Sequence, residues 1–176
     1  MKVQHLDFLC CPECKSDFSI DSKKSVGDKI IEGTLYCDEC PESYEITNSI
    51  PRFVSYRGYA DSFGKQWKAF ARSQIDKDDI KESSLRFDSE IGWKSNDLKG
   101  KKILEVGSGA GRFIEVVSSM QAGLVIGMDI TNAVDASKEN LGDRDNILFI
   151  QGDIFNSPIK KESLDSWFLA PNENIN

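Results

Sequence analysis

The five cysteines of this chain all lie within its first 40 residues, and the rest of the 176-residue sequence contains none. Four of them form two C-x2-C pairs, Cys11 with Cys14 and Cys37 with Cys40, separated by 22 residues. Two such turns facing each other supply the four thiolate ligands of a tetrahedral, structural zinc ion. The pattern therefore predicts a zinc-binding module at the N-terminus, distinct from the remainder of the chain.

The fifth cysteine, Cys10, lacks the two-residue spacing to Cys14, so we expect it to be a buried thiol outside the metal site. The alternative is a pair of disulfides or redox-active motifs, which an intracellular chain without a thioredoxin-like pattern disfavours. A module of this size buries little apolar surface, so the metal is expected to supply most of its stability. Cys14→Ser or Cys37→Ser should then unfold residues 1–55 and leave the later residues largely intact.

Residues 6–54 contain "LDFLCCPECKSDF" and "GTLYCDECPESYEITNSIPRFV". These stretches resemble the short zinc-ribbon family that includes the activator subunit of eukaryotic tRNA and release-factor methyltransferases. The resemblance implies an interaction module that docks a protein partner or the rest of this chain. We expect a small β domain over residues 1–55, with strands in "KIIEGTLYC" and "SYEITNSIPRFV", a turn in "DSKKSVGD", and His5 at the surface.

Residues 56–99 change in character. The stretch "YADSFGKQWKAFARSQ" places Phe63, Trp67 and Phe70 on one face of a helix, and "SSLRFDSEIGW" comes after a charged run. We therefore predict a helical connector with an aromatic face.

The stretch "KKILEVGSGAGRFIEVV", residues 101–117, reads as a buried strand that breaks on three glycines and restarts as an amphipathic helix. Such a turn is a common place for a nucleotide. The glycines form G-x-G-x-G, and Arg112 stands where a dinucleotide fingerprint has its third glycine. No Gly-Lys-Ser/Thr comes after the loop, which excludes a P-loop.

Glu105 precedes the first glycine by two residues. A carboxylate there would repel a pyrophosphate, but it suits a ligand that carries an ammonium group and a sulfonium. The free backbone N–H groups at the helix start can hold one small carboxylate. The loop therefore predicts S-adenosylmethionine as the ligand.

Two further acidic residues end the next two predicted strands. Asp129 closes "GLVIGMDI", where a carboxylate can accept both ribose hydroxyls, and Asp153 closes "ILFIQGDI", where it can take the adenine amino group. The N–H of Ile154 would then lie on the adenine ring. Strands and helices alternate from Lys101 onward, which predicts a parallel sheet.

The set "ILEVGSGAGRF", "GMDI", "QGDI" and "SLDSW" resembles the first four motifs of class I S-adenosylmethionine-dependent methyltransferases, over residues 101 to about 168. The resemblance implies an α/β fold: a partial Rossmann-like, doubly wound parallel sheet with strand order 3-2-1-4 over residues 100–176. The segments "FGKQW" and "LRF" resemble that family's helices that close over the cofactor, although packing alone also explains them. The implied cofactor-binding residues are Glu105, Gly107, Ser108, Gly109, Gly111, Asp129, Ile130, Asp153 and Ile154.

The sequence departs from that family at its end. The family's sheet has seven strands, and four are readable here before an Asn-rich tail that begins at Pro171. We therefore expect a C-terminal truncation in which the part that selects the methyl acceptor is missing. No catalytic base is identified, and in-line methyl transfer from a sulfonium depends mainly on alignment and electrostatics.

Acidic residues outnumber basic ones, 29 against 22, for a formal charge of −7. This balance favours a small-molecule acceptor over nucleic acid, so an RNA methyltransferase ranks third. The second hypothesis is a catalytically inactive interaction module in which the ribbon binds a protein partner. No signal peptide and no run of about 20 apolar residues is present, so a cytoplasmic protein without membrane contact is expected.

Overall fold

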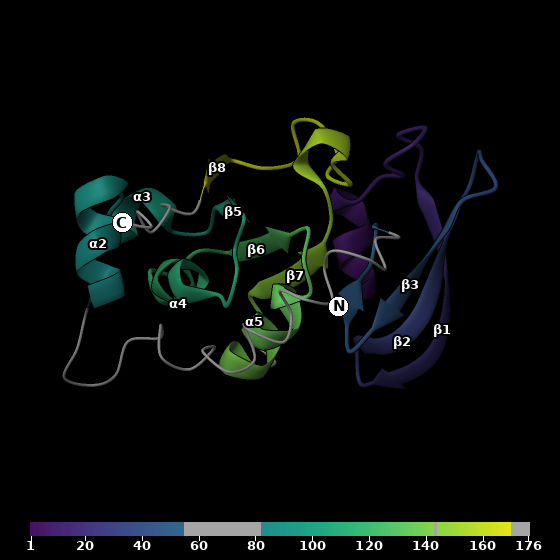
Figure 1. The fold of residues 1–176 in the computed structure, drawn as a ribbon, viewed down its shortest axis with the longest axis horizontal. Helices are drawn as coiled ribbons and strands as arrows, with labels where there is room; N and C mark the ends of the chain where they lie inside the picture. Colours follow the sequence, from purple (N-terminus) through teal and green to yellow (C-terminus); the bar gives the residue numbers. More distant parts are fainter. Residues whose placement is uncertain (55–81, 143, 170–176) are drawn as a thin grey trace.

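The computed structural model describes residues 1–54, 82–142 and 144–169, which form two sheets (Figure 1). The first sheet is antiparallel and belongs to the cysteine-rich segment. The second is parallel and contains the glycine loop. The expected connector helix around Phe63, Trp67 and Phe70 and the tail from Pro171 lie outside the described residues.

The antiparallel sheet has the order β1-β2-β3-β4 and comes after a short 3-10 helix, η1. Its elements are η1 (Val3–Phe8), β1 (Phe18–Val26), β2 (Lys29–Cys37), β3 (Ser43–Thr47) and β4 (Ile50–Pro51). The predicted strand "KIIEGTLYC" is confirmed as β2, whereas "SYEITNSIPRFV" forms two antiparallel strands, β3 and β4, because the chain turns at Asn48 and Ser49, which both have positive φ. The turn expected over residues 21–28 is shorter than predicted, because β1 continues to Val26 and only Gly27, with φ of 61°, and Asp28 reverse the chain.

The parallel sheet has the order β7-β6-β5-β8, which confirms the predicted order 3-2-1-4. Its strands are β5 (Lys102–Val106), β6 (Leu124–Asp129), β7 (Ile147–Gln151) and β8 (Ser166–Leu169). All three neighbouring pairs run parallel. The carboxyl ends of β5, β6 and β7 therefore meet at one edge, where the three predicted acidic residues lie.

Helices cover one face of this sheet. They are α2 (Glu82–Glu90), α3 (Ser95–Leu98), α4 (Arg112–Ser119) and α5 (Ala133–Leu141). Phe87 of α2, Phe113 of α4 and Leu141 of α5 share a buried cluster with Ile103 and Val125 of the sheet. The "LRF" segment is thus part of α2, and Phe87 is fully buried in this packing.

The antiparallel sheet covers the opposite face. A single buried cluster joins its side chains to those of the parallel sheet. The members include Leu9, Phe18, Leu35 and Ile46 from the first segment and Leu104, Val106, Ile126 and Ile150 from the second. The described residues between β7 and β8 form only a 3-10 turn, η2 (Ile154–Asn156), so the ribbon takes the place that a helix would occupy on this face.

Backbone contacts tie the two parts together at two places. Near the first cysteine pair, the Cys10 N–H donates to the Pro158 carbonyl over 2.8 Å, and the Lys160 N–H donates to the Phe8 carbonyl over 2.9 Å. After β4, the Phe53 N–H donates to the Gln151 carbonyl over 2.8 Å. The ribbon therefore contacts both the carboxyl end of β7 and the segment after it.

His5 was expected at the surface, and this expectation is wrong, because only 2% of the residue is exposed. The Met1 ammonium donates to the carbonyls of Ile30 and Ser49, over 3.1 and 2.9 Å, and holds the start of the chain against the ribbon. The Lys2 N–H donates to His5 Nδ1 over 3.3 Å. Burial, followed by the nearby Met1 ammonium, lowers the pKa of His5 to about 4.

Among the described residues, every helix is too short or too polar to cross a membrane. The division of the chain at residues 55 and 99 stays a prediction. The described elements themselves fall on either side of residues 55–81.

Candidate functional site

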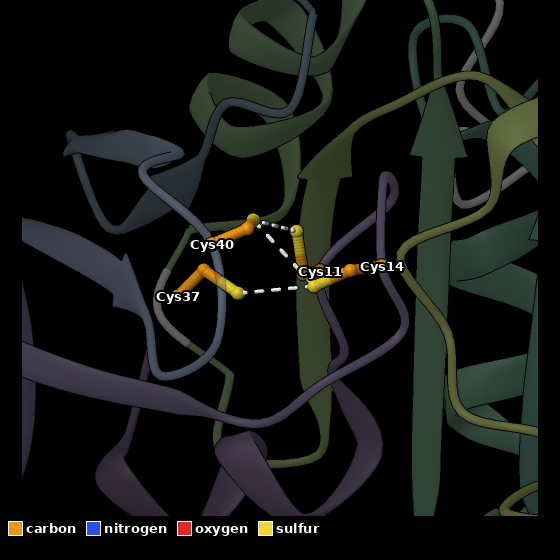
Figure 2. A group of neighbouring side chains, drawn as sticks. All are labelled: Cys11, Cys14, Cys37 and Cys40. Atoms are coloured by element: carbon orange, nitrogen blue, oxygen red, sulfur yellow. Dashed lines mark hydrogen bonds between the residues drawn. The ribbon is translucent and has the colours of Figure 1, made fainter.

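The four paired cysteines come together from two turns of the ribbon, one between η1 and β1 and one between β2 and β3 (Figure 2). Their Sγ atoms all lie within 4.8 Å of one another. The shortest separations are 3.3 Å for Cys14 and Cys37, 3.5 Å for Cys14 and Cys40, and 3.6 Å for Cys11 and Cys40. The two turns thus face each other as the spacing predicted.

These separations fit a zinc ion. With zinc–sulfur bonds of about 2.3 Å, the sulfurs of a regular tetrahedron lie about 3.8 Å apart. The spacing of a disulfide, about 2.05 Å, is absent from the described cysteines. Cys10 is 3% exposed and lies outside the cluster, as expected.

The glycine loop lies between β5 and α4. Gly107, Gly109 and Gly111 all have positive φ, of 71°, 51° and 87°, a region in which side chains are strained. A Cβ on Gly111 would also lie 3.0 Å from Leu141 Cδ1 of α5. The loop therefore requires glycine both for its turn and for its packing.

Glu105, on β5 beneath this loop, has no exposed surface. Neither of its carboxylate oxygens has a hydrogen-bond partner in the described structure, and Ser108 Oγ is buried without one too. Burial, followed by the charge of Asp129, raises the pKa of Glu105 well above its usual range, and the nearby Ile114 N–H, which lies outside hydrogen-bond geometry, partly opposes this shift. An unpartnered carboxylate in this position is costly and favours the approach of a cation.

Asp129, at the end of β6, holds the loop in place. Its Oδ2 accepts from the Gly109 N–H over 2.9 Å, and its Oδ1 accepts from the N–H and the hydroxyl of Thr131, both over 2.8 Å. A carboxylate has about four acceptor positions, so these bonds leave little capacity for two ribose hydroxyls. The expected ribose contact stays a prediction, and the structure adds a loop-anchoring role.

Asp153 comes after β7, and its Oδ1 accepts from the Phe155 N–H over 2.9 Å, which caps η2. Three apolar side chains near this edge are exposed: Ile130 at 45%, Ile154 at 43% and Phe155 at 97%. Exposed apolar side chains beside a strand-end carboxylate suit a flat heterocycle with an amino group. The contacts expected for Asp153, Ile130 and Ile154 likewise stay predictions.

Sequence reasoning missed the residues of α5 that hold the loop. Ser137 Oγ donates to the Gly109 carbonyl over 2.5 Å, and Asn140 Nδ2 donates to the Ala110 carbonyl over 3.1 Å. These contacts join residues 28 and 30 positions apart. The only signal in the sequence is that both polar side chains lie on one face of α5 at a spacing of three residues.

Comparison with known families matches two separate segments of the chain, one in the antiparallel sheet and one in the parallel sheet. Residues 2–49 match the model of Trm112p-like proteins, and residues 104–170 match a methyltransferase-domain model. No curated protein matches the sequence. The two matched segments coincide with the stretches in which the sequence resembles a zinc-ribbon family and a methyltransferase family.

Among solved structures, the chain is similar to phosphoethanolamine N-methyltransferase 1 of Haemonchus contortus, bound to phosphoethanolamine and S-adenosylhomocysteine, at 22% identity and a TM-score of 0.45. It is also similar to the complex of the Haloferax volcanii Trm112 methyltransferase activator with a candidate methyltransferase, at 16% identity and a TM-score of 0.47. A third similar structure is that of a candidate RNA methyltransferase of Pyrococcus horikoshii, at 19% identity and a TM-score of 0.41. The matches cover 66%, 65% and 61% of this chain but only 27%, 48% and 59% of those chains.

Proposed function

We propose that this chain is the cofactor-binding part of an S-adenosylmethionine-dependent methyltransferase. The observation that supports this most is the glycine loop above the buried, unpartnered carboxylate of Glu105. A dinucleotide would bring negative phosphates to this carboxylate, whereas S-adenosylmethionine brings an ammonium and a sulfonium. The methyltransferase-domain model over residues 104–170 supports the same choice.

When bound, the cofactor would supply an already activated methyl group. The methionine ammonium would favour the ionised form of Glu105, which would then provide negative charge beneath it, and the loop glycines would let the backbone approach the ligand. Asp129 would accept from the ribose with its remaining acceptor position. Asp153 would accept from the adenine amino group, and Ile130 and Ile154 would contact the ring.

The methyl acceptor is proposed to be a small molecule, because the charge of −7 disfavours phosphate-rich partners. The chain spans about half or less of the first two solved structures that it resembles, so its own activity is part of this proposal. The cytoplasmic location stays a prediction. The reading as an inactive docking module has less support, since the ribbon's apolar face already packs on this chain's own sheet.

The cysteine cluster is proposed to hold one structural zinc ion. All four ligand positions are thiols, which leaves no open position for a substrate or a water molecule. The zinc would therefore stabilise the ribbon and take no part in methyl transfer.

Calorimetric titration with S-adenosylmethionine, S-adenosylhomocysteine and NAD tests the cofactor assignment. We expect the first two ligands to bind and NAD not to bind. Asp129→Ala and Asp153→Ala should each weaken binding by roughly tenfold to a hundredfold, because hydrogen bonds to charged groups contribute about 1.5 to 3 kcal/mol. Gly109→Val should abolish binding.

Asp21→Ala, which removes an exposed carboxylate on β1, serves as the matched control and should leave affinity unchanged. Binding of NAD in preference to both S-adenosyl ligands would contradict the assignment. So would an unchanged affinity in both strand-end variants.

A further inference from the structure

Arg52, at the end of the ribbon, makes a two-bond side-chain contact between the two parts of the molecule. Its Nη2 donates to Asp135 Oδ1 over 2.6 Å, and its Nη1 donates to Asp135 Oδ2 over 3.2 Å. The two side chains are only 17% and 29% exposed. A two-bond guanidinium–carboxylate pair of this kind fixes direction as well as distance.

Arg52 is itself held on the ribbon side. Its Nε donates to Thr47 Oγ1 of β3 over 2.9 Å. The guanidinium is thus fixed at one end by the ribbon and at the other by α5. Its place relative to α5 therefore depends on the ribbon being folded.

The partner of this ion pair belongs to the helix that holds the glycine loop. Asp135 lies in α5, from which Ser137 donates to the Gly109 carbonyl and Asn140 to the Ala110 carbonyl. Displacement of α5 would change both bonds at once. The first branch of contacts from Arg52 therefore ends at the glycine loop.

A second branch ends at the loop after β6. Arg52 Nη1 also donates to Gln151 Oε1 over 3.0 Å. Gln151 Nε2 in turn donates to the Ile130 carbonyl over 3.2 Å and to Asn132 Oδ1 over 3.0 Å. Because Arg52 occupies the oxygen of the Gln151 amide, it directs the amide nitrogen toward this loop.

We propose that Arg52 is a positioning residue through which the ribbon sets the geometry of both loops of the candidate cofactor site. The identity of the ligand rests on the proposed function, but the positioning of the loops does not. The ribbon then acts on the site within its own chain, through α5 and Gln151, without touching the ligand. Neither contact is local in sequence, since they span 83 and 99 residues.

Amide hydrogen exchange on the full chain, without ligand, tests this directly. The reporter amides are those of Gly109 and Thr131, both bonded to Asp129, and of Asp135, bonded to the Asn132 carbonyl. Arg52→Met should increase their exchange roughly fivefold or more, the lower end of usual coupling between sites. The Val125 amide in β6 should keep its wild-type rate.

Arg144→Met is the matched control. Arg144 also pairs with a helix, through Glu115 of α4 over 3.2 Å, but it precedes β7, whereas Gln151 ends that strand. The two arginines thus lie at opposite ends of β7. The control should leave the reporter amides at wild-type rates.

Two milder variants distinguish the contacts that run through Asp135 from those that run through Gln151. They also test the proposal if Arg52→Met does not fold. Asp135→Asn should mainly accelerate exchange at Gly109, and Gln151→Met should mainly accelerate it at Thr131. Arg52→Lys, which retains charge but loses the two-bond geometry, should give an intermediate rate. Unchanged reporter rates, or an equal rise at Val125, would overturn the proposal.

Titration with S-adenosylhomocysteine forms the second arm. If wild type binds it, Arg52→Met should weaken binding roughly fivefold or more, with Arg144→Met unchanged. Binding that is equal in both variants would overturn the proposal. If wild type does not bind it at all, the proposed function fails, and the exchange rates alone decide the role of Arg52.

Discussion

At the scale of single residues, Glu105 is a carboxyl group that is buried although its ionised form is more stable in water. Burial and the charge of Asp129 raise the pKa of this carboxyl well above its usual range. An acid whose pKa is raised in the folded state stabilises the fold at low pH. That contribution declines as the pH rises from about 4.3, the unfolded value, and is lost through the folded pKa.

We predict that Glu105→Gln removes this pH dependence. The wild type should lose stability relative to the variant by up to about 1.4 kcal/mol per pH unit above pH 4.3, the limit for one proton. Urea unfolding at several pH values between about 5 and 8 measures the difference. Parallel pH profiles of the free energy of unfolding would show that Glu105 is not held in its neutral form.

His5 should give the opposite dependence, because its pKa in the folded chain is lowered to about 4. Its contribution is present above the unfolded pKa of about 6.5 and is lost as the pH falls through about 4. We predict that His5→Leu flattens the profile in this window, by about 3 kcal/mol over its width. His5 is the chain's single histidine, so the difference between the two urea-unfolding profiles can be assigned to it.

At the scale of elements, the residues that flank the first cysteine pair also pack against the parallel sheet. Leu9, beside the first pair, and Phe18, after it, lie in the same buried cluster as Leu104 and Ile126 of the parallel sheet. The sequence alone suggested that loss of a ligand would leave the later residues intact. The packing gives a different expectation, since an unfolded ribbon would expose one face of the sheet.

We therefore predict that Cys37→Ser loses zinc and also exposes apolar surface on the parallel sheet. Metal analysis should give close to one zinc per wild-type chain, and the variant should bind a hydrophobic dye that the wild type does not. Cys10→Ser is the matched control and should retain the metal. Dye binding equal to wild type in a zinc-free Cys37→Ser variant would show that the sheet stands without the ribbon.

At the scale of the molecule, the two sheets share one core and should unfold together. All three tryptophans, Trp67, Trp93 and Trp167, come after the ribbon in the sequence, so their fluorescence reports on the later residues. Release of zinc to a chromogenic chelator reports on the ribbon. We predict that heating gives coincident transitions for both signals, as expected for one cooperative unit. Two separated midpoints would contradict a shared core.

The sequence by itself determined the elements whose signals are local. Two cysteine pairs predicted the cluster, and alternating strand and helix patterns predicted a parallel sheet. The order of its strands was implied by the resemblance to class I methyltransferases. The glycine spacing predicted the loop, because positive φ at Gly107, Gly109 and Gly111 is a property of residue type. Each of these features is encoded within about 30 residues of chain.

Only the tertiary structure decided where the ribbon lies. It placed the ribbon on the open face of the parallel sheet, turned His5 inward, and joined Arg52 to Asp135 and Gln151. These contacts join residues far apart in sequence. Neither the periodicity nor the spacing of residues within one element predicts them. The sequence of the ribbon's apolar residues does not distinguish burial against a partner protein from burial against the chain itself. In the structure these residues are buried against the parallel sheet of the same chain.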